Sequence, residues 1–182
     1  DFFHAIPASR IEAFWRRCGW GRRAASALAG ICCHEGRLPQ GAPTSPALSN
    51  IVNGRLDARL CGLAAHFGGT YTRYADDITV SLPAFSRREA KLIPAIRRIL
   101  REEGYEIQKG KRVRVQPRHR RQTATGLVVN TAANLPRPLR RRIRAMQHHR
   151  AKGTLPPADA RRLAGYEALQ HMIATAGPRM PI

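Results

Sequence analysis

The sequence predicts an α+β fold in which helices pack on one face of a small antiparallel sheet. Two observations lead to this class. Apolar residues recur at helical spacing over several segments, and between them lie two β-rich segments, 70–82 and 123–130, of which the first has a turn at its centre. The expected order is helix, helix, loop, helix, hairpin, helix and strands, which is typical of α+β domains. With 182 residues, the chain suffices for one domain, or for one domain and part of another.

Three helices are expected before the hairpin. Ser9 can cap the first while Glu12 reaches back to it, as in a capping box. The second covers 22–31, and a loop rich in glycine and proline follows at 36–43. Thr44, Ser45 and Pro46 would cap and open a long amphipathic helix that ends at 68–69. Its apolar positions are Leu48, Ile51, Val52, Leu56, Leu60 and Leu63.

After the hairpin, residues 86–89 form a second expected capping box. The helix that they open should end at Gly104 and bend at Pro94, because proline removes a backbone hydrogen bond. Its apolar positions are Leu92, Ile93, Ile96, Ile99 and Leu100. Two short strands are expected within 105–115, then the β-rich segment 123–130, a helix from Pro136 and a last helix over 158–176. A subdomain boundary is expected near 132–138, which divides the chain into 1–133 and 134–182.

The composition indicates a polyanionic partner. Lys and Arg number 32 against 12 Asp and Glu, so the net charge is +20, far beyond what solubility requires. Nucleic acid is therefore the leading partner. No apolar run approaches the length of a bilayer span and no signal-peptide pattern is present, so we expect a soluble, intracellular protein. The four cysteines lack CxxC spacing and are interpreted as reduced, structural thiols.

Asp76 and Asp77 are adjacent carboxylates in a chain that has few acidic residues. At the tip of a strand-turn-strand hairpin, both side chains can reach one side. Such a pair suits a divalent cation, because Mg²⁺ prefers oxygen ligands and offsets the repulsion between like charges. The alternative is an ordinary solvated turn, in which Asp is common.

Several motifs together resemble the palm of bacterial reverse transcriptases, in particular the retron type. Residues 40–50 read QGAPTSPALSN, and YADD follows about two dozen residues later at 74–77. Residues 107–112, IQKGKR, are similar to a family segment usually written I-N-x-x-K-T, and 125–130, TGLVVN, to the V-T-G-L-V-V-N of retron enzymes. Gln108, Arg112 and Ala124 depart from the usual Asn, Thr and Val, which weakens the retron assignment more than the polymerase assignment.

The resemblance implies roles for individual residues. Asp76 and Asp77 would be catalytic metal ligands, and Lys111 would meet the leaving phosphates unless it is simply a solvated lysine. Gln40, Gly41, Tyr74 and Ala75 would line the nucleotide and primer site, and Phe3 would reject a ribose 2′-hydroxyl, whereas Phe2 and Phe3 could both be plain core. In the family register, another metal-binding Asp precedes Asp1, so we expect a segment of a longer protein, inactive by itself.

The implied reaction is attack of a primer 3′-hydroxyl on a deoxynucleoside triphosphate, with two Mg²⁺ ions at the attacking and leaving oxygens. The partners would be an RNA template, an RNA/DNA primer duplex and dNTPs, with a structured noncoding RNA and an effector protein as further candidates, in the bacterial cytoplasm. Residues 1–133 would be the palm and 134–182 the start of a helical thumb. The arginines that would bind the duplex backbone there are Arg137, Arg140, Arg141, Arg142 and Arg144.

Two alternatives stay open at this point. One is a reverse transcriptase of a phage-defence system or of a group II intron. The other, from a different class, is a nucleic-acid-binding module that has lost catalysis. The intact Asp76 and Asp77 pair favours the enzyme, because binding alone gives no reason to keep two like charges together.

Overall fold

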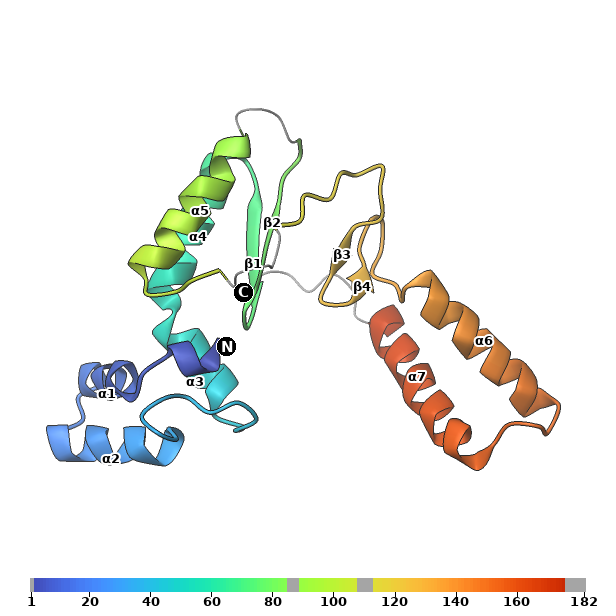
Figure 1. The fold of residues 1–182 in the computed structure, drawn as a ribbon, viewed down its shortest axis with the longest axis horizontal. Helices are drawn as coiled ribbons and strands as arrows, with labels where there is room; N and C mark the ends of the chain where they lie inside the picture. The colour runs from blue at the N-terminus through green and yellow to red at the C-terminus, as the bar shows by residue number, and fades with distance from the viewer. Residues whose placement is uncertain (1, 85–88, 108–112, 176–182) are drawn as a thin grey trace. The chain divides into compact units, whose positions relative to one another are not determined.

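The computed structural model describes residues 2–84, 89–107 and 113–175, and these form an α+β protein (Figure 1). The chain divides into two compact units, Asp1–Val113 and Arg114–Ile182. Each has its own core. Across the described ranges, no helix combines the length and the apolar character needed to cross a bilayer.

The first unit begins with a short 3₁₀ helix, η1 (Phe3–Ala5), followed by α1 (Ala8–Arg17) and α2 (Arg22–Cys32), which pack against each other. The predicted capping box at Ser9 and Glu12 is wrong. Helix α1 starts after an extended Pro7, and no side chain caps it. The first-turn amide of Ala8 instead donates to the carbonyl of Gly36, 2.8 Å away, so the loop between α2 and α3 takes the place of a cap.

The predicted long helix is two helices, α3 (Ser45–Val52) and α4 (Gly54–His66), which meet at Asn53. Asn53 is fully buried and leaves helical geometry, with φ −93° and ψ 7°. Its side-chain carbonyl accepts a hydrogen bond from the Tyr105 hydroxyl at 2.7 Å. The change in direction also takes Ile51 out of the core, where it was predicted, and leaves it 49% exposed.

The central hairpin pairs β1 (Thr70–Tyr74) with β2 (Asp77–Ser81) in antiparallel register. Helices α4 and α5 (Leu92–Glu102) lie side by side, and α4 packs on β1 (Figure 1). A 3₁₀ turn, η2 (Glu89–Lys91), precedes α5, and 86–88 of the predicted capping box lie outside the described residues. Pro94 falls in the first turn of α5, where its missing N–H has no helical acceptor, so the predicted interior bend is wrong.

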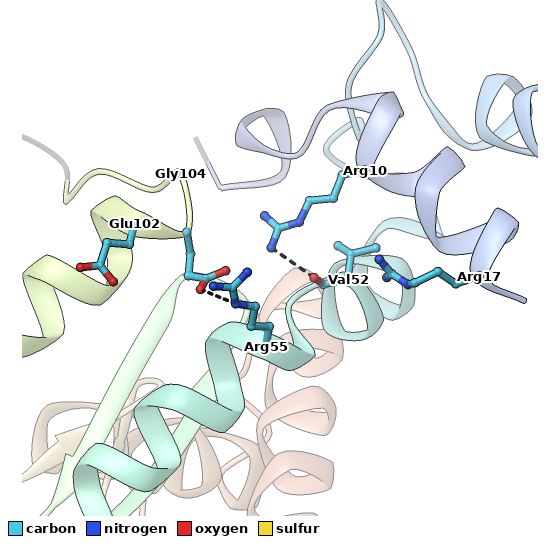
Figure 2. A pocket seen from close by; sticks show the side chains of 7 residues that line it. Arg10, Arg17, Val52, Arg55, Glu102 and Gly104 are labelled. Atoms are coloured by element: carbon cyan, nitrogen blue, oxygen red, sulfur yellow. Dashed lines mark hydrogen bonds and ion pairs between the residues drawn. The ribbon is translucent and has the colours of Figure 1, made fainter.

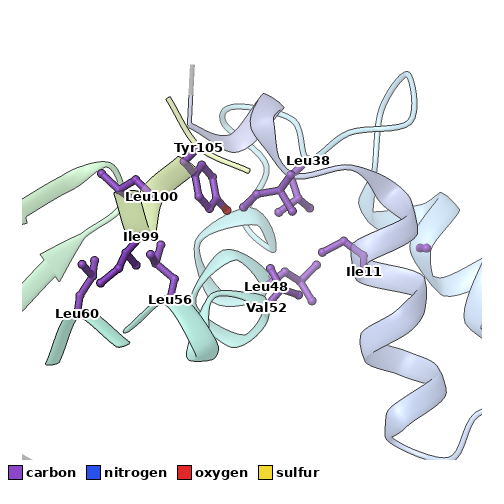
Figure 3. Close-up of a cluster of buried hydrophobic side chains, with 11 residues drawn as sticks. Ile11, Leu38, Leu48, Val52, Leu56, Leu60, Ile99, Leu100 and Tyr105 are labelled. Atoms are coloured by element: carbon purple, nitrogen blue, oxygen red, sulfur yellow. The ribbon is translucent and has the colours of Figure 1, made fainter. Parts of the chain in front are cut away.

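The core of the first unit joins α1, α3, α4 and α5 (Figure 3). Its fully buried or nearly buried side chains include Ile11, Leu38, Leu56, Leu60, Ile99 and Leu100. Tyr71 and Ile78 of the hairpin pack against this cluster from the side. The hairpin is therefore anchored by one face only, and its other face is left to solvent.

The second unit holds a small hairpin, β3 (Thr123–Ala124) and β4 (Leu127–Val128), and two helices, α6 (Arg137–Ala151) and α7 (Pro157–Thr175). Thr125 and Gly126 both have positive φ, 47° and 86°, as a type I′ turn requires. The core of the unit consists of Leu135, Ile143, Met146 and Leu163, with Leu127 packed against it.

Two sequence predictions need correction here. The described residues form two separate two-stranded sheets in place of one sheet. The strands expected within 105–115 are not found at 105–107 or 113–115, and 108–112 lie outside the described residues. The compact units meet at Val113 and Arg114, and Val128 and Asn134 exchange backbone hydrogen bonds of 2.8 and 2.9 Å within the second unit; the expected subdomain boundary near 132–138 stays a prediction.

Candidate active site

The predicted carboxylates lie at the exposed tip of the first hairpin. Tyr74 pairs with Asp77, so Ala75 and Asp76 form a two-residue turn. Ala75 has φ 50°, a left-handed conformation that is uncommon for a residue other than glycine. Asp76 and Asp77 are both exposed, and Tyr74 is 73% exposed. The prediction that both acids share a hairpin tip is confirmed.

The two faces of the hairpin differ in chemistry. Side chains alternate along a strand and directly paired residues share a face, so Tyr74 and Asp77 lie on one face and Tyr71 and Arg73 on the other. The Tyr74 face is open to solvent near the turn. The Arg73 face meets α4, and the Arg73 side chain is only 5% exposed.

On this inner face Arg73 forms a bidentate ion pair with Asp57, which lies in the first turn of α4. Its Nε and Nη2 donate to Asp57 Oδ1 and Oδ2 at 2.7 and 2.6 Å. The Tyr71 hydroxyl donates to the same Oδ1 at 2.7 Å. Arg73 Nη1 lies 3.2 Å from the carbonyl of Ala75 and donates to it. One guanidinium thus connects α4 to the turn that carries Asp76.

This network shifts the ionisation of its members. Burial alone would raise the pKa of the Asp57 carboxyl, but the hydrogen bonds from Arg73 and Tyr71 and the guanidinium charge outweigh it and hold that pKa below its ordinary value. Burial, together with donation to the Asp57 carboxylate, raises the pKa of the Tyr71 hydroxyl. Asp57 is therefore a carboxylate and Tyr71 a neutral donor at neutral pH.

The N-terminal aromatic residues lie beside this network. The Phe2 ring is stacked on Tyr105 with centroids 5.7 Å apart, and the guanidinium carbon of Arg73 is 5.7 Å from the Phe2 centroid. Phe3 is in η1 with its ring 5.4 Å from that of Phe2. Both are half-buried against the core of the unit, so packing accounts for part of their role.

Gln40 and Gly41 are exposed in the loop that leads into α3. Gly41 has φ 89°, a conformation that favours glycine, although a Cβ there would meet no atom within 4 Å. The loop is fastened at its base by the Ser45 hydroxyl, which donates to the Pro39 carbonyl at 2.7 Å. Lys111 lies outside the described residues.

The predicted duplex-binding arginines lie on α6, in the second unit. All are exposed on the helix whose other side buries Ile143 and Met146. The members are Arg137, Arg140, Arg141, Arg142 and Arg144. The structure supports their availability to a ligand.

A pocket of about 590 Å³ opens elsewhere in the first unit (Figure 2). Arg10, Arg55 and Glu103 are among its lining residues, and Arg55 Nε lies 3.3 Å from Glu103 Oε1. Arg10 donates to the carbonyl of Val52 at 3.2 Å. The pocket includes none of the predicted site residues, and two of its arginines, Arg10 and Arg55, are already engaged with the protein.

The donor set at the hairpin tip fits a magnesium ion. Two carboxylates supply hard oxygen ligands, and Mg²⁺ in nucleotide enzymes is held by one or two carboxylates together with substrate phosphates. Within the described ranges, no group of three or more His, Cys, Asp or Glu side chains is placed to hold a metal by itself. The tip therefore suits a metal ion whose coordination shell is completed by ligands from a substrate or from other residues.

Asp57 and Arg73, whose ion pair connects α4 to the turn, were not singled out in the sequence. A signal for them was present, because Arg73 occupies the inward face of a strand, where a charge needs a buried partner. Asp57 is the acidic residue of α4, whose range 54–66 was predicted to be helical.

Comparison with known proteins places these features in a family. Residues 3–133 match the family model described as reverse transcriptase (RNA-dependent DNA polymerase). The chain is 37% identical over 195 residues to the retron Mx65 reverse transcriptase of Myxococcus xanthus, covering 95% of this chain and 44% of that protein. It is 37% identical over 150 residues to the retron Ec86 reverse transcriptase of Escherichia coli, covering 82% and 46%.

A third relative is the retron Mx162 reverse transcriptase of Myxococcus xanthus, which is 34% identical over 216 residues, with 98% of this chain and 44% of that protein covered. The chain thus spans a little under half the length of these relatives. The family model covers both the QGAPTSP loop and the YADD hairpin, the motifs on which the resemblance in sequence rests. The chain belongs to the reverse transcriptase family.

Proposed function

We propose that this chain is the palm and the start of the thumb of a retron-type RNA-directed DNA polymerase. The observation that carries the proposal is the exposed pair Asp76 and Asp77, in a chain of the reverse transcriptase family. The pair lies at the tip of a hairpin whose other face packs against the core. The similarity to three retron enzymes supports the retron type.

Asp76 and Asp77 would hold Mg²⁺ at the tip. The ion would neutralise charge on the reacting phosphate oxygens when it is bound. The protein contributes placement: the hairpin fixes the two acids at adjacent positions, and the positive φ of Ala75 directs the turn. The small side chain of Ala75 leaves room for a primer terminus beside the acids, and the exposed Tyr74 ring offers a surface for it.

We assign the remaining substrate contacts from the exposure of the residues and from their positions in the motifs. Gln40 presents a donor and an acceptor from an exposed loop, and Gly41 allows close approach of backbone to a ligand. Phe3 would be the residue that discriminates against a ribose 2′-hydroxyl, and Lys111 would meet the leaving phosphates. We propose 1–133 as palm and 134–182 as the start of the thumb, where the α6 arginines would contact the duplex backbone.

The partners would be an RNA template, a primer duplex and dNTPs, with a structured noncoding RNA as the natural template of a retron enzyme. An effector protein is a further candidate partner, and the bacterial cytoplasm is the proposed location. A gene for a structured noncoding RNA next to this one would support the retron assignment, whereas a ribozyme would indicate a group II intron enzyme.

The test is primer extension by the complete enzyme on a primed RNA template with dNTPs and Mg²⁺. We expect Asp76→Asn and Asp77→Asn each to abolish extension while RNA binding persists, because only the metal ligands are lost. Glu35→Gln is the control, since that carboxylate is also exposed, at 86% of its side-chain surface, but lies outside the YADD hairpin and is not one of the proposed site residues. Extension at the normal rate by a double Asp variant would overturn the metal-ligand roles.

The same experiment addresses the binding-module alternative. If the wild-type enzyme binds RNA but extends no primer under any divalent ion, a module without catalysis becomes the better description. If ribonucleotides are excluded by wild type and admitted by Phe3→Ala, the proposed role of Phe3 is supported. An unchanged preference would leave Phe3 as a packing residue only.

A further inference from the structure

A basic loop, defined as residues 117–121, leads into β3 in the second unit and is drawn in yellow in Figure 1. Its sequence is PRHRR, and all five residues are exposed. Arg118, Arg120 and Arg121 have no hydrogen bond or ion pair from their side chains to any described part of the chain. The loop therefore presents three uncompensated positive charges close together.

The side chain of Asn130 holds the backbone of the basic loop through hydrogen bonds. Asn130 Nδ2 donates to the carbonyls of Arg118 and Arg120 at 3.2 and 2.8 Å. Its Oδ1 accepts from the amide of Gln122 at 2.9 Å. A turn hydrogen bond from the Arg120 amide to the Pro117 carbonyl, 3.0 Å, closes the loop.

A second amide side chain holds the base of the loop. Gln116 Oε1 accepts from the Thr123 amide at 2.7 Å, and Gln116 Nε2 donates to the Thr123 carbonyl at 2.9 Å. Gln122 Nε2 closes the set by donating to the Gln116 carbonyl at 2.8 Å. Three side-chain amides, those of Asn130, Gln116 and Gln122, thus hold the loop in the way that the hydrogen bonds of a strand ladder would, and the arginine side chains take no part.

This division has a physical consequence. A loop that is ordered before binding loses less conformational entropy when a ligand orders it, so each contact contributes more to affinity. Three arginines on a fixed backbone suit a row of phosphates, because a guanidinium donates in a bidentate way to phosphate oxygens. The loop has no Phe, Tyr or Trp, and its one aromatic ring is that of His119, so phosphate contacts by the three guanidinium groups outweigh base stacking.

We propose that the basic loop is a preformed binding surface for the phosphate backbone of nucleic acid, formed by residues other than those of the hairpin tip and of α6. The proposal rests on the proposed function, since the polymerase supplies the nucleic acid that the loop would contact. The proposed site lies on the segment just before β3. The sequence motifs assigned no binding role to that segment.

The test measures binding of a primed RNA template by the complete enzyme as a function of salt. For the triple variant Arg118→Gln, Arg120→Gln, Arg121→Gln, we expect the slope of log K against log salt to be smaller by about two to three, because each lost phosphate contact removes roughly 0.7–0.9 of a released counterion. At 0.1 M salt the affinity should fall by at least about tenfold.

A matched triple variant controls for net charge. It removes three exposed arginines from the first unit, Arg16→Gln, Arg22→Gln, Arg23→Gln. We expect it to change the salt slope by less than one. An equal loss in both triple variants would show that only the overall charge matters and would overturn the loop as a site.

Asn130→Ala separates order from charge, because it keeps every arginine and removes the support of the loop. We expect several-fold weaker binding without a change in the thermal unfolding midpoint of the enzyme. If the unfolding midpoint of Asn130→Ala falls, the triple arginine variant alone decides whether the loop is a site, because its exposed substitutions leave the fold intact. Wild-type enzyme that neither binds nor extends a primed RNA would instead refute the proposed function, whereas normal extension with a normal salt slope in the triple variant would refute the loop.

Discussion

The ion pair between Arg73 and Asp57 should both stabilise the first unit and position the carboxylate tip. Removing one partner of a buried pair costs about 3–5 kcal/mol. For Arg73→Gln we expect less, about 2–3 kcal/mol, because the Asp57 side chain is 31% exposed and can regain water. For Asp57→Asn we expect a cost nearer to about 4 kcal/mol, since the cation left behind is only 5% exposed.

Urea unfolding followed by tryptophan fluorescence is a suitable assay. The two tryptophans, Trp15 and Trp20, both lie in the first unit, so the signal reports that unit. The matched control is Arg59→Gln, on the same helix α4. Arg59 is paired with Glu102 and Glu103 at the end of α5, and among the described residues it forms no hydrogen bond or ion pair with the hairpin turn.

The control should cost clearly less than either change to the buried pair, because Glu103 keeps Arg55 as a partner and the Arg59 side chain is 30% exposed. If Arg73→Gln and Asp57→Asn destabilise the unit no more than Arg59→Gln, the bidentate pair is not holding the hairpin. A double-mutant cycle gives the coupling energy, which we expect to be about 2 kcal/mol, against near zero for Arg73 with Arg59.

An apolar pair separates stability from positioning. Replacing a buried ion pair with apolar residues of similar size often leaves stability unchanged. The double variant Asp57→Leu, Arg73→Met should therefore fold, but it cannot donate to the carbonyl of Ala75. If the proposed polymerase activity holds, kcat should fall about tenfold or more with template-primer affinity unchanged. Normal kcat in this folded variant would show that Arg73 has no positioning role.

Further outcomes follow from the same unit. Since the folded pKa of Asp57 lies below its unfolded value of about 3.9, the pair stabilises above about pH 4, and the stability gap between wild type and Asp57→Asn should shrink as pH falls through the folded pKa. Gly69→Ala should lower the free energy of unfolding in urea by about 1–3 kcal/mol, because the added Cβ would lie 2.7 Å from the Ser81 carbonyl. Gly62→Ala should raise it by about 0.5–1 kcal/mol, because Gly62 lies in a helix and its Cβ would meet no atom within 4 Å. Ala75→Val should lower kcat and stability while Ala75→Gly keeps both, because a β-branched residue is strained at φ 50°.

The helices were largely predictable, because their apolar residues recur every three or four positions. The break at Asn53 was not predictable from that pattern. It depends on a hydrogen bond from Tyr105, which follows 52 residues later, and a polar residue inside a periodic run gives no indication of such a partner. The predicted capping box of α1 was wrong for a similar reason. The first amide of the helix donates to the carbonyl of Gly36, which is distant in sequence, and not to a local side chain.

The candidate site was predictable where it rests on local sequence. Asp76 and Asp77 are adjacent, and a turn between two β-rich arms places them together. The network beneath them depends on a residue in α4 and another in β1, 16 positions apart, and periodicity alone does not reveal the pairing. A buried-face arginine in a strand does indicate that an acid lies nearby, and Asp57 could have been named on that ground.

The hairpin has to satisfy two opposed electrostatic requirements within five residues. For the proposed metal-binding role its carboxylates must stay accessible to a cation, but a left-handed alanine and two adjacent negative charges both cost free energy in the turn. Placing Arg73 on the opposite face meets both requirements. The Arg73 charge is neutralised by Asp57 and so does not compete for the proposed metal site, while Arg73 Nη1 donates to the Ala75 carbonyl and holds the turn. The alternation of the strand keeps the structural ion pair on one face and Asp77 on the other, so that the tip can be held in place without lowering its negative charge.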